Sequence, residues 1–513
     1  MYLLLPLLSS LLYILSFPFN ISGYIAYIAL VPLFLLFSST AKKAFASGAI
    51  FGTVISIYFS IPLYHSLTIN TETSLVIPAL LVLITVILPC AIIYAAYSVI
   101  CRWSENLPLF LKLLFPASLW ITIDYARGLS PFILPWGLAG YTQVYSPFIQ
   151  SAAIGGIHLV TFITVLINTL IAEIIFHVKQ HRLSSTGNTR ISEIIKNKKI
   201  IYCAITLLIF SVIDLAYGLT IKEVTLSNEN KSDKINYLIV QGNYGSIERW
   251  NENSTGARYH TYATLTGKGI NKADFIVWPE TVLNSSDKIN YEVMTGISSL
   301  LNDKSYFIAG GVRRDSKKHT FNSIFVSGKN GLEYIYDKKY LFPYSEQPFL
   351  GMSAGSFMNS PEKFKEGKSP DIYKTGNFLT GFSICFESIY PQVIRRAALS
   401  GASLLINVAN DSWFGESSVP FMQMYAVITR AIENRVSIIR AANSGISFAV
   451  SPSGKVVSEI PLNTRDISQG ELPVSVNRSF YSRGGDMIII FAIIIILSAL
   501  LLDELKKSRN NIS

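Results

Sequence analysis

Long apolar runs with few charges constrain this chain more than any other feature. Eight such runs lie near residues 2–17, 21–39, 44–65, 75–100, 109–126, 149–177, 199–219 and 485–502. A helix needs about 17–25 apolar residues to cross a bilayer, so each run predicts a membrane span, although the first and last are short. Half of the 513 residues are hydrophobic and only 15% are charged, which excludes a disordered chain and an ordinary soluble enzyme.

Residues 220–484 have a different pattern, in which short apolar strands alternate with turns and charged helices. Strands are predicted at 235–241, 275–278, 306–311, 323–327, 333–336, 376–385, 403–408, 438–442 and 447–451. Helices are predicted at 248–268, 291–301, 391–400 and 421–435. Strands mixed with helices indicate an α/β layered domain. The predicted organisation is a multi-span α-helical membrane domain over 1–219 with about seven helices, an α/β domain over 220–484, and a last helix with a basic tail over 485–513.

The distribution of lysine and arginine predicts the orientation of these spans. Basic residues gather in the loops after the second, fourth and sixth runs and in the tail after residue 502, whereas the loop 66–74 has none. By the positive-inside rule the basic loops are cytoplasmic. Eight spans then place both termini in the cytoplasm and residues 220–484 outside. The net charge of +10 therefore indicates topology and lipid contact, and no nucleic-acid partner is predicted. No Lys or Arg precedes Lys42, so the first run is not read as a cleavable signal.

A few polar residues within the apolar runs require a reason, because charges are costly in a bilayer. Asp124 and Arg127 are three residues apart, which allows an ion pair on one helix face, and Glu173 lies in the sixth run. A pair at the end of a span and a functional role both remain open. Three of the four cysteines lie in apolar stretches and no CxxC pattern exists, so neither a disulfide framework nor a metal site is predicted.

Three residues of the α/β domain have side chains suited to covalent catalysis and follow predicted strands. Glu280 follows FIVWP, Lys338 follows the run EYIY, and Cys385 ends GFSIC before a helix. A thiol at such an elbow lies near helix N–H groups, which favour the thiolate. A carboxylate within reach could take the thiol proton and return it to a leaving group. The three groups suffice for acyl transfer through a thioester, but by spacing alone a lone cysteine at a strand end is more often a buried core residue.

The motifs around these residues resemble the nitrilase superfamily. They are FIVWPE, YDKKYLFPYSE, ICFES and NDSWFG, in that order along the chain. The resemblance implies an α-β-β-α layered fold and places the catalytic glutamate, lysine and cysteine on Glu280, Lys338 and Cys385. The segment LFPYSE sets the register on Lys338, so that the adjacent Lys339 is expected to be a solvated neighbour.

The membrane half resembles the apolipoprotein N-acyltransferase family. The motifs are ALVPLF, LWITIDYARG, PWGLAGYTQ, IGGIHLVTF and, before the last span, YSRGGD. The resemblance implies that Cys385 attacks the sn-1 ester of a phospholipid, with phosphatidylethanolamine the expected donor. The acyl group then passes from the thioester to the α-amine of a diacylglyceryl-cysteine at an apolipoprotein N-terminus. Glu280 is the expected base and acid, and Lys338 stabilises the oxyanion and helps keep the thiolate. No cofactor is implied, and the expected location is the bacterial inner membrane with a periplasmic catalytic domain.

The same resemblance implies a set of supporting or substrate-binding residues. These are Glu346, Glu387, Trp250, Phe386, Asn410, Trp413 and Phe349. Glu346 is expected to orient Lys338 or the attacking amine, with a loop charge as the alternative. Glu387 could bind backbone N–H groups of the elbow or cap the helix. Trp250 is expected near the lipid or in the core, and Asn410 and Trp413 in the pocket wall.

The chain departs from the family pattern at two positions. Phe386 stands where the family often has Tyr, and Gln423 where it commonly has His. Two apolar segments flank the expected site, 349–358 and 419–424. We expect them to contact lipid or to form a lid, with packing on the core as the alternative.

Two other functions compete with acyl transfer. A membrane-tethered amidase would use the same three residues with water as the acceptor, but a tether needs one span rather than eight. A transporter or receptor with an extracytoplasmic binding domain would not need the three residues, and it would carry more intramembrane charges than this chain has.

Overall fold

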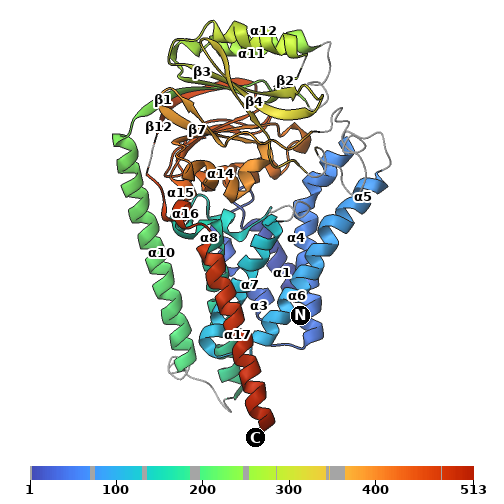
Figure 1. Cartoon of the computed structure of the whole chain (residues 1–513). Helices are drawn as coiled ribbons and strands as arrows, with labels where there is room; N and C mark the ends of the chain where they lie inside the picture. Colours follow the sequence, from blue (N-terminus) through green and yellow to red (C-terminus); the bar gives the residue numbers. More distant parts are fainter. Residues whose placement is uncertain are drawn as a thin grey trace. The chain divides into compact units, whose positions relative to one another are not determined.

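The computed structural model describes residues 3–69, 75–129, 136–184, 197–245, 254–284, 286–342, 346, 364–474 and 477–512 (Figure 1). The chain divides into two compact units. The first comprises residues 1–61, 79–222 and 484–513, and the second comprises 62–78 and 223–483.

The first unit is helical. It contains all or most of the helices α1 (Leu4–Leu15), α2 (Ala26–Ala29), α3 (Val31–Phe34), α4 (Ala41–Ile69), α5 (Val76–Val82), α6 (Leu88–Ser104), α7 (Leu109–Leu129), α8 (Ala152–Ser184), α10 (Lys198–Lys231) and α17 (Met487–Ile512). The last residues of α4 and α10 and the first of α5 belong to the second unit. Six helical stretches of the described chain are long and apolar enough to cross a membrane. The first two predicted spans are shorter helices, Leu4–Leu15 and Gly23–Phe34. Pro18 follows α1 and Pro32 lies in the first turn of α3, where proline limits helix extension.

Three charges singled out in the apolar runs, Asp124, Arg127 and Glu173, form ion pairs inside the protein. Arg127 Nη1 lies 3.0 Å from Asp124 Oδ1 on α7, and Arg127 Nη2 donates to the carbonyl oxygen of Trp136 at 3.1 Å. Glu173 on α8 forms an ion pair with Lys112 on α7, with 2.6 Å between Glu173 Oε1 and Lys112 Nζ. The ion pair predicted from the i, i+3 spacing of Asp124 and Arg127 is therefore confirmed.

The second unit contains two six-stranded sheets. The first has the order β12-β1-β2-β3-β4-β5 and the second β11-β10-β9-β8-β7-β6. The strands of the first sheet are β1 (Lys234–Gln241), β2 (Phe275–Leu283), β3 (Tyr306–Arg314), β4 (Thr320–Gly328), β5 (Gly331–Asp337) and β12 (Asp466–Pro473). Those of the second are β6 (Ile372–Thr375), β7 (Phe378–Ile384), β8 (Leu404–Ala409), β9 (Ser437–Ala442), β10 (Ser447–Val450) and β11 (Val456–Ile460). In each sheet three consecutive strands are parallel, β1-β2-β3 and β7-β8-β9, and the outer strands are antiparallel.

The two sheets lie between pairs of helices, so the α-β-β-α layering is confirmed. Helices α11 (Thr255–Gly267) and α12 (Asp287–Ser298) cover the first sheet, and α14 (Pro391–Leu399) and α15 (Val419–Asn434) cover the second (Figure 1). The main core fills the space between the sheets. It joins inward side chains of β1, β2, β4, β7, β8 and β9, most of them fully buried.

The sequence patterns found the apolar central strands and missed three others. β6, β11 and β12 were not predicted because they lie at sheet edges and many of their positions are exposed or half-buried, which leaves no apolar run. The strand predicted over 376–385 begins only at Phe378, because Gly376 turns the chain with a φ of +62°. Its predicted last residue, Cys385, lies outside the strand.

Burial between the sheets predicts where a single truncation will matter most. Ile406 on β8 is 0% exposed in the core, whereas Val457 on β11 is 38% exposed. Ile406→Ala should lower the free energy of unfolding by about 2–5 kcal/mol, because it removes buried methyl groups and leaves a cavity. Val457→Ala should change it by less than about 0.5 kcal/mol. Urea unfolding of the full chain in detergent, followed by tryptophan fluorescence, measures both, and equal losses would contradict this packing.

Candidate active site

Polar side chains collect where strands of the two sheets end. Lys338 follows β5, Cys385 follows β7, Asn410 follows β8 and Asn443 follows β9. Adjacent parallel strands bring their carboxyl ends to one edge, where α/β folds place their chemistry. The structure therefore brings together residues that are distant in sequence.

Glu280 was predicted after a strand, but it lies inside one. β2 continues to Leu283, and its pairing with β3 is irregular between Trp278 and Leu283. Thr281 has a φ of +55°, which is rare for a β-branched residue and marks local strain. Such a bulge re-aims the side chain of Glu280 out of the regular ladder. Gly310 on β3 permits the close approach, since a Cβ there would lie 2.5 Å from Glu280 Cα.

Glu280, Lys338 and Glu346 form one buried charged cluster. Lys338 Nζ lies 2.8 Å from Glu346 Oε2 and 3.5 Å from Glu280 Oε1. All three side chains are less than 10% exposed. Burial alone lowers the pKa of the Lys338 ammonium, but Glu346 and then Glu280 outweigh it and hold that pKa above its ordinary value. Lys338 therefore stays protonated. Lys339, the alternative lysine, instead forms an ion pair with Asp371.

Asn322 on β4 belongs to the same cluster and was not predicted. Its Nδ2 lies 2.7 Å from Glu280 Oε1 and 2.8 Å from Glu346 Oε1. Its carbonyl oxygen accepts the N–H of Lys338 at 2.8 Å. In sequence it is one amide at the start of an apolar strand, FNSIFVS, and nothing nearby marks it as part of a site.

Cys385 sits at a strained elbow between β7 and a short 3₁₀ helix, Cys385–Ile389. Its φ of +52° lies in the left-handed region, which non-glycine residues adopt only where neighbouring contacts require it.

Glu387, two residues later, holds this elbow in place. Its carboxylate accepts the N–H of Ile384 at 2.7 Å, the N–H of Lys339 at 2.7 Å and the N–H of Tyr340 at 3.1 Å. Tyr336 Oη donates to it as well, at 3.1 Å. Burial raises the pKa of Glu387, and the backbone donors act in the opposite direction. One carboxylate thus ties the elbow of Cys385 to the segment that carries Lys338.

The surroundings of Cys385 act on its thiol in opposite directions. Burial, and then the charge of Glu280, raise the pKa of the thiol well above its ordinary value, and Lys338 only partly opposes them. A thiolate would add a negative charge to a buried site that already holds two carboxyl groups and one ammonium. Burial and Glu280 thus oppose the thiolate that the elbow and Lys338 were expected to favour, and the ionisation of the resting thiol stays a prediction for alkylation to test.

The two departures from the family pattern, Phe386 and Gln423, are both buried. Phe386 is 2% exposed, and its ring packs edge-to-face on Phe342 and Tyr390 with centroids 5.2 and 5.3 Å apart. Gln423 Oε1 accepts from Arg440 Nη2 at 2.6 Å, and the same guanidinium pairs with Asp411 at 2.8 Å. Both positions are therefore integrated into buried packing rather than left open.

The remaining predicted site residues divide into three groups. Asn410 Oδ1 accepts from Asn443 Nδ2 at 3.4 Å in the buried wall after β8 and β9, and Trp413 lies partly buried in the next turn. Residues 419–424 were expected to contact lipid or to form a lid, and their burial instead favours the stated alternative, packing on the core. They form the first turns of α15, and Val419, Met422 and Met424 are less than 5% exposed. Trp250, Phe349 and the apolar segment 349–358 lie outside the described residues.

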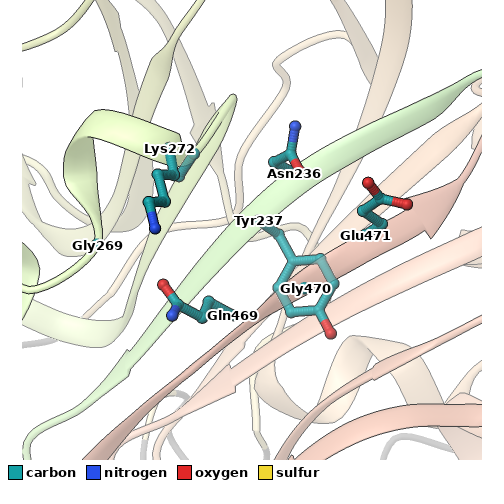
Figure 2. A pocket seen from close by; sticks show the side chains of 8 residues that line it. Asn236, Tyr237, Gly269, Lys272, Gln469, Gly470 and Glu471 are labelled. Carbon is teal, nitrogen blue, oxygen red and sulfur yellow. The ribbon is translucent and has the colours of Figure 1, made fainter.

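One cavity of the second unit lies away from these residues. It has a volume of about 300 Å³ and is lined from β1, β12 and the turn before β2 (Figure 2). Its lining includes Asn236, Lys272, Gln469 and Glu471, and no predicted site residue. Within the described ranges no group of three or more His, Cys, Asp or Glu side chains could hold a metal ion.

Comparison with known proteins identifies both parts of the chain. Residues 9–170 match the family model of the apolipoprotein N-acyltransferase N-terminal domain, and residues 239–481 match that of carbon-nitrogen hydrolases. An apolipoprotein N-acyltransferase of Geobacter metallireducens is 27% identical over 502 residues, covering 94% of this chain and 92% of the relative. One from Rickettsia typhi is 27% identical and covers 74% of each chain. The crystal structure of Saccharomyces cerevisiae Nit3, a nitrilase-superfamily member, is 17% identical, covers 47% of this chain and 91% of its own, and has a TM-score of 0.38.

The α-β-β-α layers and the hydrolase match define the second unit as a nitrilase-type domain. It is joined here to a helical membrane domain with its own family match. The chain belongs to the apolipoprotein N-acyltransferase family.

The raised pKa of the Cys385 thiol leads to a testable prediction about pH. Alkylation of Cys385 by iodoacetamide should keep accelerating from about pH 7 to about pH 10, because the raised pKa of the thiol delays ionisation. Lys338→Met should slow alkylation about tenfold, since Lys338 lowers that pKa. Lys339→Met is the matched control and should leave the rate unchanged. Intact-mass spectrometry measures each rate, and a plateau below about pH 7 would show a resting thiolate instead.

Proposed function

We propose that this chain is an apolipoprotein N-acyltransferase that works through a thioester on Cys385. It moves an acyl chain from a phospholipid to the α-amine of the N-terminal diacylglyceryl-cysteine of a lipoprotein. The observation that carries the proposal is the buried cluster of Glu280, Lys338 and Glu346 beside the strained elbow of Cys385, in a chain whose membrane domain matches the same family. Phosphatidylethanolamine is the proposed donor.

The first half-reaction begins with a proton transfer. Glu280 takes the thiol proton of Cys385. The negative charge moves from the carboxylate to the sulfur, so the buried site gains no additional net charge. Sulfur attacks the ester carbonyl of the phospholipid, and negative charge develops on the carbonyl oxygen. The ammonium of Lys338, kept protonated by two carboxylates, stabilises that oxyanion. Glu280 then protonates the leaving alkoxide, and a lysophospholipid departs.

The hydrogen bonds support Glu280, rather than Glu346, as the base. Glu346 accepts from Lys338, from Asn322 and from the N–H of Phe342, which together engage both of its oxygens. Glu280 accepts from Lys338 and Asn322 on Oε1 only, and among the described residues no donor engages Oε2. A carboxylate with a free oxygen can accept a proton, so Glu280 is the base and Glu346 the group that orients Lys338.

The second half-reaction reverses these roles. The α-amine of the acceptor attacks the thioester, and Glu280 takes the proton that the amine loses. The tetrahedral intermediate again places its oxyanion against Lys338. Collapse releases the amide product, and Glu280 returns the proton to the sulfur of Cys385. Both half-reactions use the same base and the same oxyanion site, as expected of a two-step transfer through a covalent intermediate.

The acyl-enzyme is the direct test. Wild-type protein incubated with phosphatidylethanolamine and no acceptor should gain the mass of one acyl chain, and Cys385→Ala should not. A diacylglyceryl-cysteine peptide should discharge the adduct. Glu280→Gln should slow acylation by about 10²–10⁴-fold, because it removes the general base.

Other outcomes of this experiment assign other functions. Release of ammonia from small amides, with no acyl adduct, would make the chain a membrane-tethered amidase. Neither adduct nor ammonia would favour a transporter or receptor. Lys339→Met, whose ammonium pairs with Asp371, is the control and should acylate at the wild-type rate.

We propose the bacterial inner membrane as the location, with the nitrilase-type domain in the periplasm and both termini in the cytoplasm. Clusters of basic residues such as Lys42–Lys43 and the tail after residue 502 support it. A cysteine introduced at Ser508 should react with a membrane-impermeant maleimide only after the inner membrane is opened, whereas one at the exposed Lys288 should react in cells with a permeabilised outer membrane alone. The opposite labelling pattern would contradict the topology.

A further inference from the structure

Asn322 lies at the centre of the charged cluster without being charged itself. It is 1% exposed on β4, and its Nδ2 contacts one oxygen of Glu280 and one oxygen of Glu346. Its backbone carbonyl also accepts the N–H of Lys338. One residue therefore contacts all three charged members of the cluster.

The chemistry of the amide determines which way it points. An amide nitrogen carries two hydrogens, and here it faces two carboxylate oxygens at 2.7 and 2.8 Å. The flipped amide would place an oxygen against two other oxygens, which is repulsive. Within the described part of the chain, Oδ1 of Asn322 has no hydrogen-bond partner, although it is buried. An unsatisfied buried oxygen costs stability, whereas the two contacts made by the amide nitrogen stabilise the cluster.

The donor contacts select one oxygen of Glu280. Asn322 and Lys338 both reach Oε1, at 2.7 and 3.5 Å. No described donor reaches Oε2. A carboxylate that rotates freely offers either oxygen, whereas this one has a single oxygen left for the proton of the thiol or of the acceptor amine.

We infer that Asn322 is a positioning residue, which holds Glu280 by Oε1 so that Oε2 is the basic oxygen, and keeps Glu280 apart from Glu346. The inference rests on the proposed acyl transfer, and it assigns Asn322 no contact with substrate. Asn322 donates one hydrogen bond to each carboxyl group, and such donors in general stabilise a carboxylate over its protonated form.

The charged groups that face Asn322 are few. They are Glu280 from β2, Glu346 and Lys338, with the thiol of Cys385 next to them. Asp337 and Arg313 form their own pair, and Asp337 bonds Ser323, whose side chain points to the opposite face of β4. The pH dependence of acylation therefore reports on the cluster that Asn322 bridges.

Two variants separate positioning from simple packing. Asn322→Leu keeps a similar shape and removes both donors, and Asn322→Asp keeps the shape and adds a negative charge between two carboxylates. The rate of Cys385 acylation by phosphatidylethanolamine, measured by intact mass from about pH 5 to about pH 9, should fall about 10–100-fold at its plateau in Asn322→Leu. Its acidic limb should move to higher pH by about one unit, and further in Asn322→Asp.

Ser327→Ala provides the matched control. Ser327 lies on the same strand and is equally buried, and its hydroxyl has no hydrogen-bond partner among the described residues. It should keep the wild-type rate and the wild-type limb. A lower rate in both Asn322 variants with an unmoved acidic limb would mean a packing role and overturn the inference, as would wild-type rates. Absence of an acyl adduct in the wild type would instead reject the proposed function, so the two failures are distinguishable. Should Asn322→Leu not fold, Asn322→Ala decides in its place, because it also removes both donors and adds no charge that would move the limb by repulsion.

Discussion

The buried ammonium of Lys338 is the constraint on which the site depends. It is 2% exposed, and a charge so far from water must be paired. Glu346 and Glu280 provide the pairing, so the strand that carries Glu280 has to bring its carboxylate inward. The irregular β2, the positive φ of Thr281 and the bare backbone of Gly310 are the local means of doing so. The strain near Glu280 thus follows from the need to neutralise one lysine.

The nucleophile belongs to the other sheet, and a second carboxylate makes the connection. Glu387 accepts from Ile384 at the end of β7 and from Lys339 and Tyr340 after β5. Donors from both sheets therefore converge on one side chain. The left-handed backbone of Cys385 persists because these bonds over-determine the elbow around it. Buried hydrogen bonds to Glu387 therefore link the backbone next to Cys385 with the segment that follows Lys338.

What could be predicted from the sequence divides along physical lines. Apolar runs identified the central strands and the long apolar helices, and motifs singled out Glu280, Lys338 and Cys385 as candidate site residues, because both signals are local. Asn322 was missed because a bridging amide is defined by its two partners, which are 42 and 24 residues away. The burial of residues 419–424 was missed for a related reason, since an apolar segment looks the same whether it faces lipid or the core. The pKa of the Cys385 thiol likewise depends on burial and on charges from several segments, which no single stretch of sequence reveals.

The two departures from the family pattern show which part of the site tolerates exchange. Gln423 cannot ionise, yet it bonds Arg440, whose charge is already balanced by Asp411. A histidine there would add a titratable group to a pair that is neutral without it. Phe386 replaces a hydroxyl by packing against two aromatic rings, which needs no polar partner. Neither exchange alters the charge shared by Glu280, Lys338 and Glu346. Both exchanges therefore keep the packing around Phe386 and Gln423 buried and without an added charge, and the ion pairs of Lys338 with Glu280 and Glu346 do not depend on either of them.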